Sequence, residues 1–142
     1  MHAVRIAALS SALIALSPLP AAAADNYEPI AYALVDAGGK VLRSGGQSKV
    51  LVERPSKGNY CVLLRKDLPG DDTRKWWNNL PVLATPAQPG AEVLIAASTG
   101  FRGICDQYEK QDYKDGDWFA VHVTIKSLQG GFVNEEFNVL VP

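Results

Sequence analysis

The chain has 142 residues, with 14 lysines and arginines against 15 aspartates and glutamates, for a formal net charge of −1. A nucleic-acid-binding domain of this size would carry a basic face, so the balanced charge argues against a nucleic-acid partner. Two cysteines and, after residue 24, a single histidine are too few for a metal site of the usual kind. We therefore expect no metal and no cofactor.

The first 24 residues have the pattern of a secretory signal peptide. A weakly basic head precedes a mostly apolar run over 6–16, two prolines follow, and the small residues of 21–24 form a cleavage signature. We expect cleavage after Ala24, which leaves 118 residues in one domain, exported to the periplasm or the medium. The alternative is an uncleaved membrane anchor, which needs a longer apolar run than this one. No later run is long enough to span a membrane.

Short apolar segments separated by Gly, Pro and Asp predict an all-β domain. The expected strands, in chain order, are 27–36, 41–43, 50–53, 59–65, 80–84, 92–97, 118–126 and 137–141. The first two form a hairpin around a turn at 37–40, and 55–58 and 86–90 also turn the chain. About eight short strands at this spacing are typical of a single antiparallel β-sandwich or small barrel.

The strand expected at 59–65 is the best candidate for the centre of a sheet. Its side chains are apolar on both faces, which is typical of a strand that is covered on both sides. Tyr60, Val62 and Leu64 face one way, and Cys61 and Leu63 face the other.

The segment 118–141 is expected to form a hairpin around which the domain is organised. Gly130 and Gly131 allow a tight reversal, so the strand at 137–141 would return beside the strand at 118–126. Alternation in the first strand predicts one buried face and one wetter face. The buried set is Phe119, Val121, Val123 and Ile125, and the wetter set is Trp118, Ala120, His122, Thr124 and Lys126.

A fixed order of strands and turns runs through nearly all of the chain after residue 24. Its members are Ala33 to Asp36, Gly39, Val41, Arg43, Glu53-Arg54, Gly58, Tyr60, Ala84-Thr85, Gly90 to Ala97, Val121-His122-Val123 and Phe137 to Val141. This order resembles that of small secreted bacterial β-domains of unknown function. The resemblance implies a β fold and export, and it implies no activity and no site residues. The loops at 69–79 and 98–117 are longer here than in that pattern.

Cys61 and Cys105 are the two cysteines of the chain, and we expect them to form a disulfide. Exported proteins fold in oxidising compartments, where an isolated pair of cysteines is usually bonded. A bridge here would tie the long loop at 98–117 to the predicted central strand. The alternative is a buried free thiol at Cys61 and a loose one at Cys105.

Two other features could carry chemistry. His122 could join a Ser–His–Asp triad with Ser98 or another serine, but there is no Gly-x-Ser-x-Gly elbow, so a half-exposed strand residue is the simpler interpretation. An acidic cluster could bind Ca²⁺, which prefers six to eight oxygen ligands. Its spacing is not that of an EF-hand, and Lys110 and Lys114 dilute its charge, so a solvated loop is the alternative. The cluster is Asp106, Glu109, Asp112, Asp115 and Asp117.

The loop at 69–79 is the strongest candidate for function, because it places two adjacent indoles in a polar setting. Trp is enriched in binding hot spots, and a simple connection needs no tryptophan. The alternative is that one or both rings fill an end of the β core. The candidate binding residues are Arg74, Trp76, Trp77, Asn78 and Asn79.

These features predict an exported, non-enzymatic domain that binds a partner protein or an envelope glycan through its long loops. A periplasmic inhibitor or immunity protein that blocks an enzyme is the alternative class. A small hydrolase is the third, and it lacks a recognisable catalytic constellation.

Overall fold

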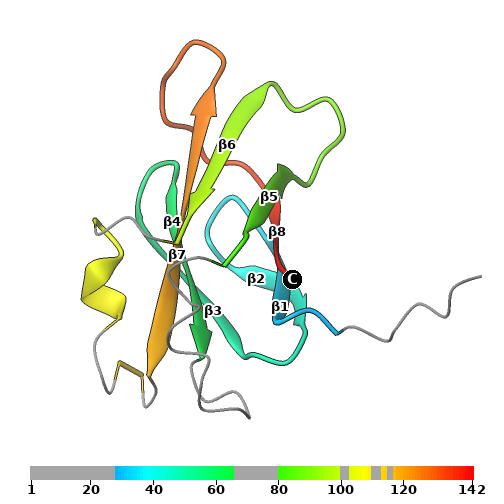
Figure 1. Cartoon of the computed structure of the whole chain (residues 1–142). Coiled ribbons are helices and arrows are strands. Elements are labelled where there is room, and N and C mark those ends of the chain that lie inside the picture. Colours follow the sequence, from blue (N-terminus) through cyan, green and yellow to red (C-terminus); the bar gives the residue numbers. More distant parts are fainter. Residues whose placement is uncertain (1–27, 66–79, 100–102, 110–112, 115–116) are drawn as a thin grey trace, which may run out of the picture.

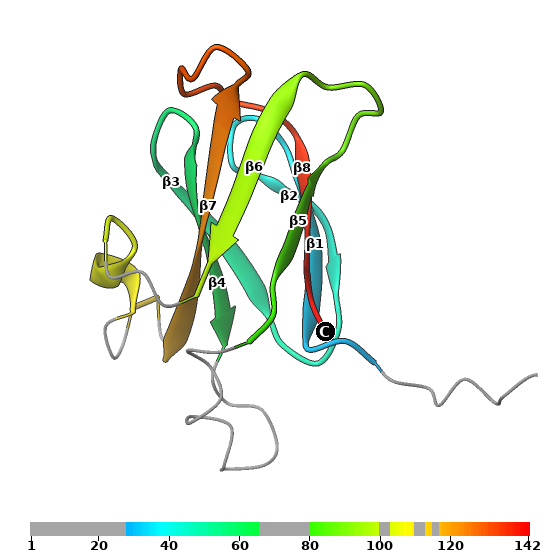
Figure 2. The same cartoon turned by 45° about the horizontal axis from the view of Figure 1, so that its top comes forward.

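The computed structural model describes residues 28–65, 80–99, 103–109, 113–114 and 117–142. These residues form eight strands in two antiparallel four-stranded sheets that pack face to face (Figures 1 and 2). The strands are β1 (Ala31–Val35), β2 (Val41–Gly45), β3 (Val50–Ser56), β4 (Asn59–Arg65), β5 (Leu83–Pro86), β6 (Val93–Ser98), β7 (Trp118–Ser127) and β8 (Phe137–Val141). The prediction of an antiparallel sandwich is therefore confirmed.

Sheet A has the strand order β2-β1-β8-β5, and sheet B has the order β3-β4-β7-β6. Only β1–β2 and β3–β4 are hairpins of consecutive strands, while β6 and β7 pair across a long connection. The chain passes from one sheet to the other between β2 and β3, between β4 and β5, between β5 and β6, and between β7 and β8. β4 lies inside its sheet between β3 and β7, as its two apolar faces predicted.

The main core lies between the sheets and follows from period-two alternation along the strands. Even-numbered residues of β4 and odd-numbered residues of β1, β7 and β8 point inward, and they are buried. This core comprises Ala31, Ala33, Val35, Val50, Tyr60, Val62, Leu64, Phe119, Val121, Val123, Ile125, Phe137, Val139 and Val141. The predicted inward face of the strand at 118–126 is thus confirmed.

The predicted hairpin of β7 and β8 is wrong, because β7 pairs with β4 and β6 while β8 pairs with β1 and β5. The chain does reverse at Gly130, which has a φ of +91° and donates its N–H to Ser127 O at 2.9 Å. The returning segment pairs with β7 only at a single bridge, between Phe132 and Lys126. Asn134 then accepts the N–H of Gly58 at 2.9 Å, and the chain continues into sheet A.

The predicted wetter face of β7 is only half correct. His122 and Thr124 are partly exposed and Lys126 is exposed, but Trp118 is 0 % exposed and Ala120 is buried. A second small core covers that end of the outer face of sheet B. It comprises Cys61, Leu63, Cys105, Trp118 and Ala120, with Leu51, Tyr108 and Tyr113 packed against it.

The turn between β1 and β2 is held by Asp36. Its Oδ1 accepts the N–H groups of Gly38 and Lys40, each at 2.8 Å, and its backbone N–H donates to Lys40 O at 2.9 Å. An aspartate that caps its own turn in this way is a common local signal, and it explains why the hairpin was recognisable from the sequence. Among the residues that the structure describes, no helix has the length and apolar character needed to cross a membrane.

Candidate functional site

The residues predicted to bind a partner lie outside the described part of the chain. Arg74, Trp76, Trp77, Asn78 and Asn79 all fall within 66–79, so their role stays a prediction. The described residues nevertheless place three other features of the sequence: the cysteine pair, part of the acidic cluster, and His122.

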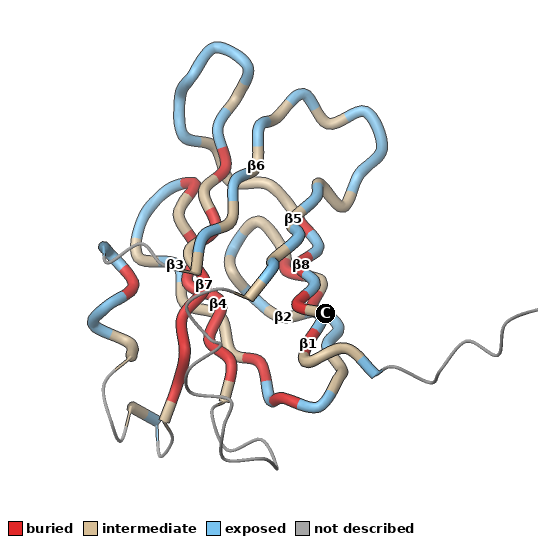
Figure 3. The backbone as a smooth tube through the Cα atoms, viewed as in Figure 1, coloured by how far each residue is buried: buried red, intermediate tan, exposed pale blue. Residues whose placement is uncertain are grey.

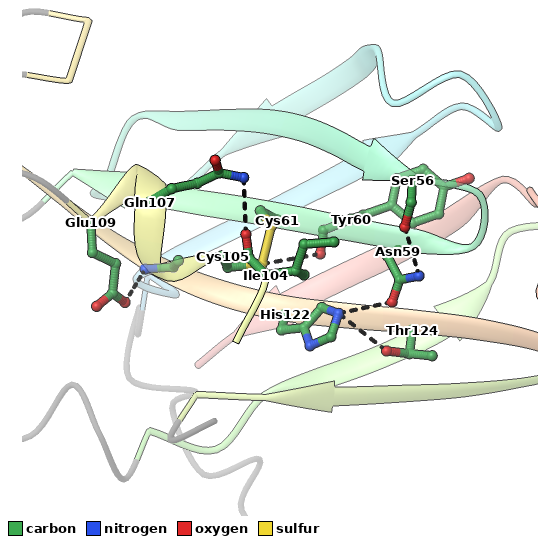
Figure 4. The surroundings of a disulfide bond; sticks show 11 residues. Ser56, Asn59, Tyr60, Cys61, Ile104, Cys105, Gln107, Glu109, His122 and Thr124 are labelled. Carbon is green, nitrogen blue, oxygen red and sulfur yellow. Dashed lines mark hydrogen bonds between the residues drawn. A yellow bond between two sulfur atoms is a disulfide. The ribbon is translucent and has the colours of Figure 1, made fainter. Parts of the chain in front are cut away.

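The predicted disulfide between Cys61 and Cys105 is present, with an S–S distance of 1.98 Å and a Cα–Cα distance of 5.6 Å (Figure 4). Cys61 lies on the outer face of β4, and Cys105 immediately precedes the short 3-10 helix η3 (Asp106–Tyr108). The bridge therefore fixes η3 against the outer face of sheet B. We call the described residues 103–109 and 113–114 the latch segment.

Hydrogen bonds also hold the latch segment to sheet B. Glu109 Oε1 accepts the N–H of Ala120 at 2.9 Å, just beyond the end of β6 (Figure 4). Trp118 Nε1 donates to Tyr113 O at 2.6 Å, and the hydroxyl of Tyr113 donates to Glu53 Oε1 at 2.9 Å on β3. Lys114 forms an ion pair with the same carboxylate of Glu53. One half of the outer face of sheet B is thereby closed.

The acidic cluster is only partly described. Glu109 uses its carboxylate on Ala120, Asp106 lies in η3, and Asp112 and Asp115 lie outside the described residues. Within the described part of the chain, no three His, Cys, Asp or Glu side chains are grouped closely enough to hold a metal ion. The proposal of a calcium site therefore stays untested.

His122 lies on the open half of the outer face of sheet B, directly opposite Ser98 of β6. Its Nε2 is 3.0 Å from Asn59 Oδ1 and 3.3 Å from Thr124 Oγ1 (Figure 4). A carbonyl oxygen can only accept, so Nε2–H donates to Asn59 and ties β7 to β4. Partial burial lowers the pKa of His122 below its usual value of 6.5, so the ring is neutral at pH 7. This geometry is that of a cross-strand structural contact.

A groove of about 250 Å³ crosses the outer face of sheet A, over β2, β1 and β8. It was not anticipated from the sequence. Tyr32 and Leu34 of β1 form its floor with Leu140 and Asn138 of β8, and Arg43 of β2 closes one side. The lining residues are Tyr32, Ala33, Leu34, Arg43, Asn138, Val139 and Leu140. We call this feature the sheet A groove.

Strand register arranges the groove in two rows. In the first row Tyr32, Leu140 and Leu83 lie side by side on β1, β8 and β5, and they are 40 %, 36 % and 59 % exposed. In the second row Arg43, Leu34, Asn138 and Thr85 follow one another across β2, β1, β8 and β5. An apolar row therefore lies beside a mixed row, in which Leu34 stands among two polar side chains and one cation.

The ring of Tyr32 lies over Gly45 of the neighbouring strand. A Cβ on Gly45 would lie 2.5 Å from Cζ of the ring, so only glycine leaves room for it. An aromatic ring laid over a glycine in this way is a known device of β-sheets. Tyr32 therefore reaches over β2 to Gly45, and it also lines the groove.

One sequence pattern could have indicated this groove, although strand periodicity alone did not predict it. Tyr32, Leu34 and Leu140 are apolar at the positions of β1 and β8 that alternate with the buried residues, so both faces of these strands are apolar. In β4 the same pattern marks a face that the latch segment covers. In sheet A, none of the described elements covers it.

Comparisons of the chain with protein-family models, with curated proteins and with solved structures find no match. A fold by itself does not define a function, so the surface chemistry of this chain is what bears on its function.

Proposed function

We propose that this chain is an exported, non-enzymatic domain that binds a protein partner through the outer face of sheet A. The observation that carries the proposal is the exposed apolar row of Tyr32, Leu140 and Leu83 beside Arg43. Apolar side chains that gather on one open face, rather than singly, are typical of interaction sites.

The composition of the groove favours a protein over a small molecule or a glycan. Tyr and Arg are enriched in protein interfaces, while Lys, Glu and Asp are depleted, and Arg43 is the charged residue among those that line the groove. The volume of about 250 Å³ is below the roughly 300–1,000 Å³ of small-molecule pockets, so it suits one inserted side chain. A glycan would need more hydroxyl-binding groups than Tyr32, Arg43 and Asn138 provide.

The size of the face limits what the partner can be. From ordinary strand spacing and rise, the face measures about 14 by 17 Å, or about 240 Å². A standard interface buries about 800 Å² on each partner. The partner is therefore expected to bring a protruding segment with an apolar side chain for the groove. A carboxylate beside that side chain would meet Arg43, which forms no ion pair with any described residue.

Two features support the proposal that the domain is exported. Disulfides persist in oxidising compartments, and the Cys61–Cys105 bridge is buried in a small core of its own. Together with the signal-like segment 1–24, this supports export to the periplasm or beyond. An inhibitor of an exported enzyme would use the same surface, so the identity of the partner decides between the two classes.

The test compares three variants of the chain from residue 25 as bait on a native periplasmic extract. The groove variant carries Leu140→Ser and Leu83→Ser, and the loop variant carries Trp76→Ala and Trp77→Ala. The control, Leu128→Ser with Phe132→Ser, changes two other exposed apolar residues of the described chain. Each bait is checked by its melting temperature before use.

We expect the groove variant to lose at least about 30-fold in capture, as truncation of a hot spot does, while the control captures normally. Loss in the loop variant alone would move the site to 69–79 and overturn the assignment to sheet A. Unchanged capture by the groove variant and by the loop variant would show that neither the sheet A groove nor 69–79 is the binding site. An enzyme among the captured proteins, if inhibited by the bait, would favour the inhibitor class.

A further inference from the structure

Strand β6 forms one edge of sheet B, and its outer side has no neighbouring strand within the described residues. Its residues alternate between half-buried and exposed, and none is buried, whereas β7 beside it and β4 beyond β7 are mostly buried (Figure 3). Leu94 is 59 % exposed. Among the described residues, no strand pairs with the row of backbone groups along this edge.

The other three sheet edges carry features that hinder pairing with a second strand. β2 is interrupted by a register shift beside Val35, β3 has a register shift before Ser56 and contains Pro55, and β5 has four residues and ends at Pro86. Short strands, bulges, prolines and charges are the usual protections of an edge. β6 has six residues, continuous register with β7, no proline and no charge.

The hydrogen-bond pattern of β7 shows which groups of β6 point outward. Ile125 donates its N–H to Gly58 O at 2.8 Å, on the β4 side, so odd-numbered residues of β7 face β4. The backbone groups of even-numbered residues therefore point towards β6. Ala120 agrees with this: it lies beyond the end of β6, and its N–H donates to Glu109 on that side instead. In an antiparallel ladder, the partners of those even-numbered residues are Leu94, Ala96 and Ser98. Val93, Ile95 and Ala97 therefore direct their N–H and C=O groups outward.

We propose that β6 pairs with β6 of a second copy of this chain, antiparallel and centred on Ile95. In this register Val93 of each copy lies opposite Ala97 of the other, and Ile95 lies opposite Ile95. Every outward N–H and C=O group of these residues then has a partner. The two copies would form one continuous eight-stranded sheet from their B sheets. This inference is independent of the groove on sheet A.

Side chains fit the same register. On the outer face, Leu94 of each copy lies beside Ala96 of the other, and this contact covers the most exposed apolar side chain of the strand. Glu92 falls opposite Ser98 of the second copy, so no like charges meet. An edge of six residues buries far less than the roughly 1,200–2,000 Å² of a stable interface, so the dimer forms reversibly with rising concentration.

The first test is sedimentation velocity on the chain from residue 25 over a wide range of concentration. Ala97→Pro removes an outward N–H without touching the pairing with β7, and Ala97→Ser is its matched control. Leu94→Lys places a charge on the exposed edge, and it replaces Ala97→Pro as the edge variant if the proline variant fails to fold. We expect the wild type and Ala97→Ser to dimerise, and Ala97→Pro and Leu94→Lys to stay monomeric with native melting temperatures.

The second test measures the register. Residues 94 and 96 of the two copies would form a non-hydrogen-bonded pair with a Cα separation of about 4.5 Å, which a disulfide tolerates. A mixture of Leu94→Cys and Ala96→Cys chains should therefore cross-link under mild oxidation more readily than either variant alone. A wild type that stays monomeric at every concentration, or dimers that persist in both edge variants, would overturn the proposal.

Discussion

Val121 and His122 are adjacent in the chain and lie on opposite faces of β7. Val121 is fully buried between the sheets opposite Val62, while His122 is partly exposed on the outer face. We expect Val121→Asp to destabilise the domain by several kcal/mol, because an unpaired carboxylate would be buried. His122→Ala removes one hydrogen bond and should cost about 1 kcal/mol. Urea unfolding of both variants checks this, and similar losses would mean that the register of β7 is shifted by one residue.

His122 should also make stability depend on pH. Burial lowers its pKa in the folded state, so below about 6.5 the unfolded chain binds more protons than the folded chain. The neutral ring contributes fully to the free energy of unfolding above pH 6.5. This contribution is lost as the pH falls from there through the lower pKa that His122 has in the folded chain. We expect the urea concentration at the unfolding midpoint to decrease as the pH is lowered from about 7.5 to about 5.5, the range in which histidine titrates. The fall should be smaller in His122→Gln, and an equal fall in both proteins would assign it to other groups.

Among the turns, Gly58 and Gly130 give a matched pair of substitutions. Both have positive φ, of +68° and +91°, which any side chain resists. A Cβ on Gly58 would lie 2.6 Å from Ile125 O, whereas a Cβ on Gly130 would meet nothing within 4 Å. We expect Gly130→Ala to cost about 1 kcal/mol for the backbone conformation alone, and Gly58→Ala to cost clearly more because the β3–β4 turn must move. Comparison of their free energies of unfolding tests the close approach of Gly58 to β7.

The latch segment depends on its disulfide. The bridge closes a loop with a sequence separation of 44, for which the entropy model gives a stabilisation of about 4 kcal/mol. We expect the double variant Cys61→Ala with Cys105→Ala to lose stability of this order. Trp118 should at the same time become accessible to a fluorescence quencher, because the latch segment covers it. If stability falls and Trp118 stays protected, the hydrogen bonds of Glu109 and Tyr113 hold the latch segment without the bridge.

Prediction from the sequence succeeded for features that a local pattern defines. It failed for features that depend on which distant segments of the chain pack together. β4 and β8 begin and end at the predicted residues, because alternation and flanking polar residues define them. The pairing of β8 was wrong, because alternation shows which face is buried but not which strand lies beside it. Trp118 was assigned to the wetter face because η3, which covers it, has no strong local pattern.

The candidate site shows the same limit. Tyr32 and Leu140 are far apart in the sequence, and only the pairing of β1 with β8 places them side by side. The apolar residues on both faces of β1 could have been noticed, but the sequence alone does not say whether such a face is covered by the same chain or left open. The cysteine pair was predictable because these are the two cysteines of the chain and its signal-like first segment predicted an oxidising compartment.

At the scale of the whole molecule, the two outer faces differ. Half of the outer face of sheet B is closed by the latch segment, whereas the outer face of sheet A carries an open groove and an exposed apolar row. The free edge of β6 lies in sheet B, away from the groove over β2, β1 and β8. A dimer through β6 would therefore carry two grooves, and both would remain accessible to a partner.

The pairing of β1 with β8 also sets the order in which the molecule can fold. Ala31 lies opposite Val141, so β1 has one neighbour, β2, close to it in the sequence and another, β8, more than 100 residues away. A chain that emerges from a ribosome or a translocation channel with its N-terminus first can form the β1–β2 and β3–β4 hairpins early. Sheet A remains split until the final five-residue strand arrives, because β8 lies between β1 and β5. Pairing between such distant segments is slow, so the complete domain forms only after β8 has emerged.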